Sequence, residues 1–290
     1  LTEDIFLLNG KEQSEKEVAK ISRFLDLFCE YIGERPFARV ESINFVPTAA
    51  GLASSASAFA ALSLAVADAL KLDMTRQELS TFARRGSGSS TRSLFGGFVE
   101  WEMGTSSEDS MAHPVDDADW DVGMLVLVVD SQEKKIASRI GMEHTVQTSP
   151  FYPAWIESAR EDLQAMKAAI AEKDFETLGR ITEHNGFKMH ATTLSANPPF
   201  TYWSADSLLA QEAVRQVREE LQVPAYMTMD AGPNVKVLCR ASDMGRLQKA
   251  LSAHFPVEKI ISSLPGPAAY VLSEADWQQS KTRLTEGNHL

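Results

Sequence analysis

At 290 residues the chain can bury one large core or two joined cores, and its 44% hydrophobic and 23% charged residues are typical of a folded globular protein. A net charge of −12 argues against binding to nucleic acid, whose phosphate backbone attracts basic surfaces. Two cysteines are too few for a disulfide framework or metal cluster, and no apolar run reaches the roughly 20 residues that span a bilayer, so we expect a cytoplasmic protein without nucleic-acid or membrane partners.

The N-terminal part of the chain predicts strands and helices that alternate. The predicted strand at the N-terminus runs into an Asn9-Gly10 hairpin turn, and the helix that follows it ends at Gly33. Thr75 and Glu78 have the spacing of a capping box at the start of a later helix. Apolar periodicity predicts a strand over 5–8, a helix over 18–32, a strand over 38–45, a helix over 58–70 and a helix over 75–85.

The remainder of the chain changes character near residue 153, where long amphipathic helices begin. The acidic segment 108–121 lacks periodicity and predicts an exposed loop. We therefore expect an α+β fold with two lobes, 1–143 and 144–290. The predicted elements are strands over 98–101 and 124–129, helices over 154–173, 175–190 and 205–221, strands over 225–229 and 235–239, a helix over 242–254 and a strand over 259–263.

A loop of small residues over 47–57 precedes the predicted helix over 58–70. Small residues let the backbone approach a ligand, and a helix N-terminus favours anions, so the loop predicts a phosphate cradle. Ser54, Ser55 and Ser57 add hydroxyls that can bind phosphate oxygens or a magnesium ion, with Ser55 the candidate for the metal. The alternative is tight helix packing, with Ser54 as N-cap.

A second small-residue loop over 86–93 combines glycines, hydroxyls and arginines, which is an anion-binding composition. Arg92 is the candidate for a carboxylate, because a guanidinium can donate two parallel hydrogen bonds to it. Arg84 and Arg85 stand at a helix C-terminus, where the helix dipole by itself favours cations. We assign a structural role to those two arginines.

Asp230 follows the predicted strand over 225–229 and begins an Asp-Ala-Gly-Pro turn into the strand over 235–239. A carboxylate at a strand end is held rigidly enough to be aimed at a substrate. The alternative is an Asx turn, in which the side chain bonds only to nearby backbone. Arg139 is a further candidate for an anionic group, whereas His190 is either part of a pocket rim or, more simply, a buried and hydrogen-bonded histidine.

The segments 47–57, 84–101 and 229–237 together closely resemble the diphosphomevalonate decarboxylases, a family of the GHMP kinase superfamily. The resemblance implies two α+β lobes with the active site in the cleft between them, usually in a homodimer. It also implies ATP-dependent conversion of mevalonate 5-diphosphate to isopentenyl diphosphate, ADP, phosphate and carbon dioxide, with Mg²⁺ accompanying ATP.

The resemblance assigns roles to individual residues. Asp230 matches the catalytic aspartate that contacts the substrate's tertiary hydroxyl, and Arg92 matches the arginine that holds its carboxylate. The positions that match substrate-binding residues are Ser87, Ser89, Ser138 and Arg139. The positions that match nucleotide-binding residues are Ser42, Asn44, Gly51, Leu52, Ala53, Ser54, Ser55 and Ser57.

Family members carry a further segment before the position of Leu1, with a lysine and a tyrosine that approach the phosphates and the substrate. We expect the 290 residues to be part of a longer chain that includes it. Three alternatives stay open: a mevalonate or phosphomevalonate 3-kinase, a monophosphate decarboxylase, and a catalytically inactive binding protein.

Overall fold

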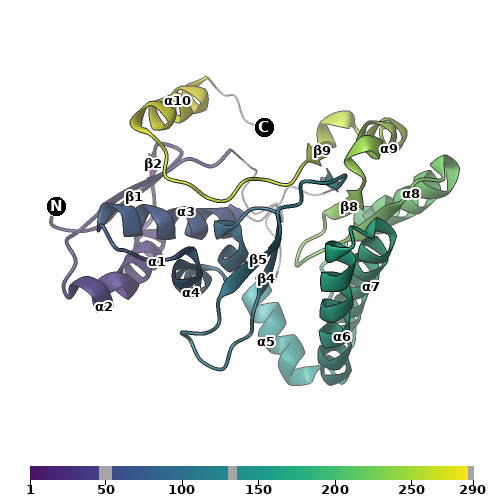
Figure 1. Ribbon diagram of the computed structural model, residues 1–290, viewed down its shortest axis with the longest axis horizontal. Helices are drawn as coiled ribbons and strands as arrows, with labels where there is room; N and C mark the ends of the chain where they lie inside the picture. The colour runs from purple at the N-terminus through teal and green to yellow at the C-terminus, as the bar shows by residue number, and fades with distance from the viewer. Residues whose placement is uncertain (46–53, 130–135, 287–290) are drawn as a thin grey trace. The chain divides into compact units, whose positions relative to one another are not determined.

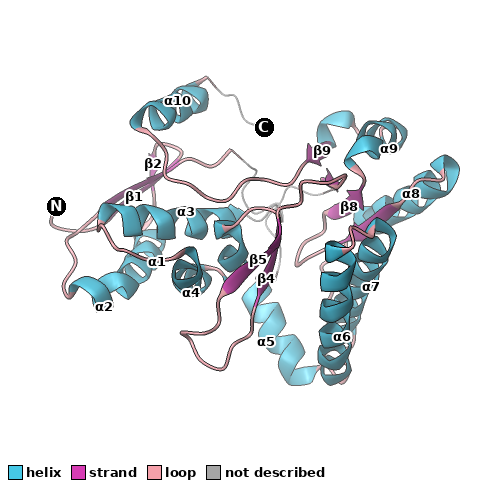
Figure 2. Ribbon diagram, viewed as in Figure 1, coloured by secondary structure: helices cyan, strands magenta, loops and turns pink. Residues whose placement is uncertain are grey.

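The computed structural model describes residues 1–45, 54–129 and 136–286, and contacts divide it into two compact units (Figure 1). Helices and strands are present in both units, which confirms the expected α+β class (Figure 2). The lobe boundary between residues 143 and 144 stays a prediction. Of the described residues, the first unit contains 1–45, 54–114 and 267–286, and the second contains 115–129 and 136–266.

The first unit carries a three-stranded sheet in the order β2-β1-β3 and a two-stranded sheet of β4 and β5. Its elements are β1 (Ile5–Leu8), β2 (Lys11–Glu12), α1 (Glu15–Leu25), the 3₁₀ helix η1 (Asp26–Phe28), α2 (Cys29–Ile32), β3 (Arg39–Ser42), α3 (Ser54–Ala69), α4 (Arg76–Gly86), the 3₁₀ helix η2 (Gly88–Leu94), β4 (Phe98–Trp101), β5 (Ala112–Asp116, which crosses into the second unit) and α10 (Glu274–Thr285).

Local turn and cap signals of the first unit are confirmed. Asn9 and Gly10 both have positive φ, 52° and 73°, as a tight hairpin between β1 and β2 requires. Thr75 and Glu78 form the predicted capping box of α4. The predicted helix over 18–32 is divided into α1, η1 and α2, and it ends at Gly33 with φ of 75°.

Several sequence-based assignments were wrong. The segment predicted as an exposed loop over 108–121 contains β5, and the second small-residue loop is largely the helix η2. The sequence analysis did not predict the helices α5 (Ser138–Thr148) and α10. Strand β5 depends on pairing with β4, and Pro114 within it is tolerated because a two-stranded sheet consists of edge strands.

The core of the first unit is aromatic. The rings of Phe24 and Phe59 lie 5.0 Å apart between centroids, and those of Phe28 and Phe82 stack at 4.8 Å. A Cβ on Gly86 would lie 2.1 Å from the ring of Phe59, so glycine is required where α4 meets α3. This packing sets the position of the helix end from which η2 continues.

The second unit is built on a four-stranded antiparallel sheet in the order β7-β8-β6-β9. The helices α6 and α7 pack against each other, and α7 also packs on β7. The elements are β6 (Gly123–Leu127), α5, α6 (Tyr152–Ala171), α7 (Phe175–Leu194), α8 (Ala205–Leu221), β7 (Ala225–Thr228), β8 (Val235–Cys239), the 3₁₀ helix η3 (Ala241–Asp243), α9 (Met244–Leu251), the 3₁₀ helix η4 (Val257–Lys259) and β9 (Ile260–Ser263).

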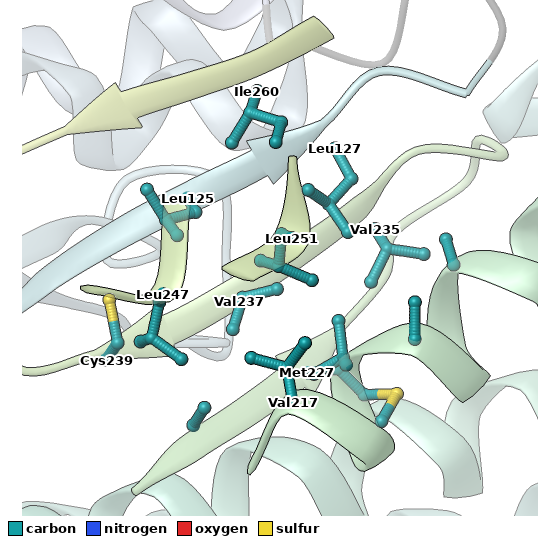
Figure 3. Packing of buried hydrophobic residues seen from close by; sticks show 14 of the residues in the cluster. Leu125, Leu127, Val217, Met227, Val235, Val237, Cys239, Leu247, Leu251 and Ile260 are labelled. Atoms are coloured by element: carbon teal, nitrogen blue, oxygen red, sulfur yellow. The ribbon is translucent and has the colours of Figure 1, made fainter. Parts of the chain in front are cut away.

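One face of this sheet forms the second core, against α8 and α9 (Figure 3). Burial raises the pKa of the Cys239 thiol to about 12, in agreement with a packing role for that cysteine. The labelled side chains that meet there are Leu125, Leu127, Val217, Met227, Val235, Val237, Cys239, Leu247, Leu251 and Ile260.

Every helix within residues 1–45, 54–129 and 136–286 is too short or too polar to cross a bilayer.

Candidate active site

The N-terminus of α3 and the segment after α4 meet through two serines. The hydroxyls of Ser55 and Ser87 are 3.2 Å apart, so the structure brings together residues from the two predicted loops. Ser57 donates its hydroxyl hydrogen to the carbonyl of Ser54 at 3.1 Å. Ser55 and Ser57 are exposed beside the first turn of a helix, whose backbone N–H groups favour an anion.

Three of the predicted nucleotide-binding residues, Gly51, Leu52 and Ala53, lie outside the described residues. Ser42 is half-buried at the end of β3, opposite Leu8 of β1. Asn44 follows shortly after, and its backbone N–H donates to Oδ1 of Asn9 at 2.8 Å. Both residues therefore belong to the edge of the first sheet, and their contact with a nucleotide stays a prediction.

Two buried hydroxyls hold η2 in place. Ser90 donates to the carbonyl of Ala83 at 2.5 Å, and Thr91 donates to the carbonyl of Gly88 at 2.5 Å. With these two side chains turned inward, Ser89 is left exposed on the same helix. The segment is thus a rigid 3₁₀ helix rather than an open loop.

Arg92 and Arg84 have different environments. Arg84 donates to the backbone carbonyl of Ser107 at 2.9 Å and to its hydroxyl at 2.6 Å, which agrees with the structural role assigned to it. Arg92 is exposed and pairs with no acidic side chain within the described ranges. Partial desolvation lowers the pKa of its guanidinium, although an arginine stays charged at neutral pH. An unpaired, partly desolvated guanidinium is suited to receive an anionic ligand group.

Asp230 follows β7, at the start of the turn into β8. The backbone of this turn is held by Ser207, whose hydroxyl donates to the carbonyl of Pro233 at 2.7 Å, and by the buried Asn234, whose Oδ1 accepts from the backbone N–H of Val129 at 2.9 Å. The strand before it is held by Glu183, which accepts from the N–H of Met227 at 2.8 Å. A fixed backbone therefore presents a carboxylate that is 57% exposed.

The sequence analysis assigned no role to Lys236, which contacts Asp230. Its Nζ donates to Oδ1 of Asp230 at 2.6 Å, and its side chain is only 14% exposed. The signal in the sequence is weak: Lys236 is a single cation between the buried Val235 and Val237, in register with Thr228 on β7. Only the pairing of β7 with β8 brings it beside the aspartate.

His190 of α7 is fully buried behind the same strand end, so the structure supports a buried histidine rather than a pocket rim. Its Nε2 lies 3.3 Å from the carbonyl oxygen of Met229. Burial lowers the pKa of His190 to about 4. The predicted buried histidine is thus hydrogen-bonded through one ring nitrogen, while Nδ1 has no partner within the described ranges.

Ser138 and Arg139 form the first turn of α5 in the second unit. Arg139 is exposed, as a residue that receives an anionic group must be. The close approach of Gly141, where a Cβ would lie 2.1 Å from the hydroxyl of Tyr202, sets the position of this helix. A role of Ser138 and Arg139 in binding the substrate stays a prediction.

No group of three or more His, Cys, Asp or Glu side chains in the described part of the chain could hold a metal ion. The exposed hydroxyl of Ser55 is an oxygen ligand of the kind that magnesium accepts. Magnesium commonly binds through few protein ligands together with substrate phosphates, and this arrangement suits a metal that arrives with a nucleotide.

Two family models match most of the chain. The diphosphomevalonate decarboxylase-like N-terminal domain matches residues 1–112, and the mevalonate 5-diphosphate decarboxylase C-terminal domain matches residues 124–286. The diphosphomevalonate decarboxylase of Candida albicans is 39% identical over 221 residues. The alignment covers 74% of this chain and 61% of that relative, so the chain spans about three fifths of the relative's length.

Solved structures of such enzymes are similar over nearly the whole chain. A structure of the mevalonate diphosphate decarboxylase from Enterococcus faecalis has a TM-score of 0.86 and 47% identity, and covers 92% of this chain and 82% of that one. A structure described as MDDEF in complex with MVAPP, AMPPCP and magnesium has a TM-score of 0.87 and 48% identity, with the same coverage. The expected GHMP-kinase type of α+β fold is confirmed by this likeness. The chain belongs to the diphosphomevalonate decarboxylase family.

Proposed function

We propose that this protein converts mevalonate 5-diphosphate and ATP into isopentenyl diphosphate, ADP, phosphate and carbon dioxide. The observation that carries the proposal is the carboxylate of Asp230, which projects from an anchored strand end with one oxygen bound to Lys236 and more than half of its surface open. Family membership and the similarity to a structure that holds MVAPP, AMPPCP and magnesium support the choice of substrates.

In the proposed reaction, the substrate's tertiary hydroxyl attacks the γ-phosphorus of ATP. A new O–P bond forms, the bond between the γ-phosphorus and the oxygen that ADP retains breaks with its electron pair left on ADP, and the hydroxyl proton passes to the carboxylate of Asp230. Asp230 accepts a hydrogen bond from this hydroxyl and orients it for in-line attack. Phosphorylation turns a poor leaving group into a good one.

Phosphate then departs from C3 with its C–O electron pair. The electron pair of the neighbouring C–CO₂⁻ bond becomes the new double bond, and carbon dioxide is released. Arg92 holds this carboxylate by two hydrogen bonds until it leaves, so the reacting bond keeps its alignment. These are positioning and electrostatic tasks, for which an exposed arginine and an aspartate on a hydrogen-bonded turn are suited.

The remaining site residues are proposed by the same reasoning. Ser87, Ser89, Ser138 and Arg139 bind the substrate, while Ser42, Asn44 and the residues 51–55 with Ser57 bind ATP. The hydroxyl of Ser55 is the proposed protein ligand of magnesium, which when bound screens the charge of the ATP phosphates. We further propose lobes over 1–143 and 144–290, a homodimer, and a cytoplasmic location.

The test is release of carbon dioxide and phosphate from the full-length protein with ATP, magnesium and mevalonate 5-diphosphate. We expect equimolar release, and a loss of about 10³-fold in the variant Asp230→Asn. Phosphoryl transfer without carbon dioxide would identify a 3-kinase, and preference for the monophosphate would identify a monophosphate decarboxylase. A protein that binds ATP and substrate but forms no product would be a binding protein.

A further inference from the structure

We infer that Lys236 is a positioning residue for Asp230, and that catalysis depends on the ion pair between them. The inference rests on the proposed function, and it deepens it by adding a residue of β8 to the reaction. The pair joins the two strands on either side of the turn, since Lys236 lies in β8 and Asp230 follows β7.

The geometry leaves one side of the carboxylate for a substrate. Lys236 Nζ lies 2.6 Å from Oδ1 of Asp230, a short, charge-assisted hydrogen bond. Because this bond engages Oδ1, the other oxygen is left to accept a hydrogen bond from a substrate hydroxyl.

The ion pair restricts a side chain that would otherwise rotate. The hydrogen bonds of Ser207 and Asn234 fix the backbone of the turn. These two bonds do not restrict the side-chain torsions of Asp230. An exposed carboxylate samples several rotamers, and a hydroxyl must be aligned closely with the γ-phosphorus to react. Lys236 reduces that freedom before substrate binds.

Stability alone does not account for a lysine at this position. Ion pairs with an exposed member contribute little to folding, and Asp230 is 57% exposed. Only 14% of the Lys236 side chain is exposed, so most of it is removed from water, on the face of the sheet opposite to the side chains of Val235 and Val237. Covering a lysine costs free energy that an ion pair with an exposed carboxylate offsets only in small part, so the contact matters more for the position of Asp230 than for folding.

The experiment compares kcat and KM of the full-length protein with those of Lys236→Met and Lys236→Arg. Methionine keeps the length of the side chain without charge, and we expect kcat to fall by about 10 to 100-fold while KM for both substrates changes by less than about 3-fold. Lys236→Arg keeps the cation, and we expect it to recover at least half of the wild-type kcat.

Lys188→Met is the matched control. Lys188 also pairs with an aspartate of the second unit, with Nζ 2.5 Å from Oδ2 of Asp162, and both side chains are 19% exposed. This pair joins α6 to α7, so its loss affects stability without contact to Asp230. We expect Lys188→Met to lower the melting temperature and to leave kcat unchanged.

Coupling between the two residues completes the test. In the Asp230→Ala background, Lys236→Met has no side-chain acceptor left to orient, so we expect it to cause no further loss. An unchanged kcat in Lys236→Met, or an equal loss in both backgrounds, would overturn the inference and leave the proposed function intact. A wild-type protein that releases no carbon dioxide would overturn the proposed function itself. If Lys236→Met does not fold, Lys236→Gln is compared in the same way.

Discussion

His190 donates its Nε2–H to the carbonyl oxygen of Met229 at 3.3 Å, so a buried imidazole supports the residue that precedes Asp230. A carbonyl oxygen only accepts, so this contact places the proton of the neutral ring on Nε2. The ring lies 4.8 Å from that of Trp203 between centroids, in apolar surroundings. The environment therefore favours the neutral form of the histidine.

The first prediction concerns the pH dependence of stability. The pKa of His190 is about 4 in the folded protein and about 6.5 in an unfolded chain. Between these values the unfolded state binds the additional proton, so the free energy of unfolding decreases as pH falls from 6.5 towards 4, by about 3 kcal/mol in all. His190→Gln keeps a donor for the Met229 carbonyl but does not titrate.

Urea denaturation of both proteins from pH 7.5 to pH 4 measures this dependence. As pH falls from 6.5 towards 4, the unfolding free energy of the wild type should decrease more than that of His190→Gln. His113→Gln is the control, since His113 is 40% exposed. Parallel curves for wild type and His190→Gln would show that the buried ring is not the titrating group.

The second prediction concerns Arg92. We expect Arg92→Gln to lower the rate of carbon dioxide release by about 10² to 10³-fold, because it removes the charge and the paired donors that hold the substrate carboxylate. Arg92→Lys should also be slow, since an ammonium group lacks the planar pair of donors. Arg85→Gln, at an exposed arginine of α4, serves as control. Equal activity of Arg92→Gln and Arg85→Gln would contradict the assignment.

The third prediction concerns an ion pair in the first unit. Arg35 donates to both oxygens of Asp4 at 2.9 and 2.7 Å, and the two side chains are 11% and 8% exposed. This contact holds the pKa of Asp4 far below its usual range. Arg35→Met leaves a buried carboxylate unpaired and should lower the free energy of unfolding by about 3 kcal/mol.

Arg39→Met provides the comparison for that substitution. Arg39 pairs with Glu41 at 2.7 Å, but both side chains of this pair are substantially exposed, at 49% and 32%. We expect a loss of about 0 to 1 kcal/mol. Guanidinium denaturation of the two variants gives both values, and equal losses would show that burial does not govern the strength of the Asp4–Arg35 pair.

The fourth prediction contrasts two glycines in helices of the second unit. A Cβ on Gly179 of α7 would lie 1.9 Å from the ring of Tyr226, so Gly179→Ala forces the ring to move and should cost about 1 to 3 kcal/mol. A Cβ on Gly245 of α9 meets no atom within 4 Å, so Gly245→Ala should stabilise the protein by about 0.5 to 1 kcal/mol. Calorimetric melting should show shifts of opposite sign, and a gain in Gly179→Ala would be inconsistent with the packing.

Sequence patterns predicted the elements that local physics specifies. Thr75 and Glu78 are three residues apart, and their capping box forms within one helical turn. The Asn9-Gly10 hairpin and the turn after β7 likewise depend on residues that are neighbours in the chain. The same holds for the helices over 154–173, 175–190 and 205–221, whose apolar spacing is strong and whose ends differ from the observed ones by at most a few residues.

The pattern failed where an element depends on distant partners. Strand β5 contains a proline and lacks alternation, and it forms because β4 pairs with it. The sequence placed Ser90 in a predicted anion-binding loop, yet its hydroxyl is buried and donates a hydrogen bond to the carbonyl of Ala83. The sequence around a serine does not show whether its side chain is buried or exposed, because this depends on the 3₁₀ helix that the segment forms.

By itself, the sequence determined the α+β class, the family and the residue types of the candidate site, because short motifs and hydrophobic periods are local properties of the chain. The tertiary structure decided which of these residues touch. Lys236 meets Asp230 only through the register of β7 with β8, and His190 reaches Met229, 39 residues away, only because α7 packs on the sheet. Such contacts arise from chain closure and packing, which no spacing along the sequence encodes directly.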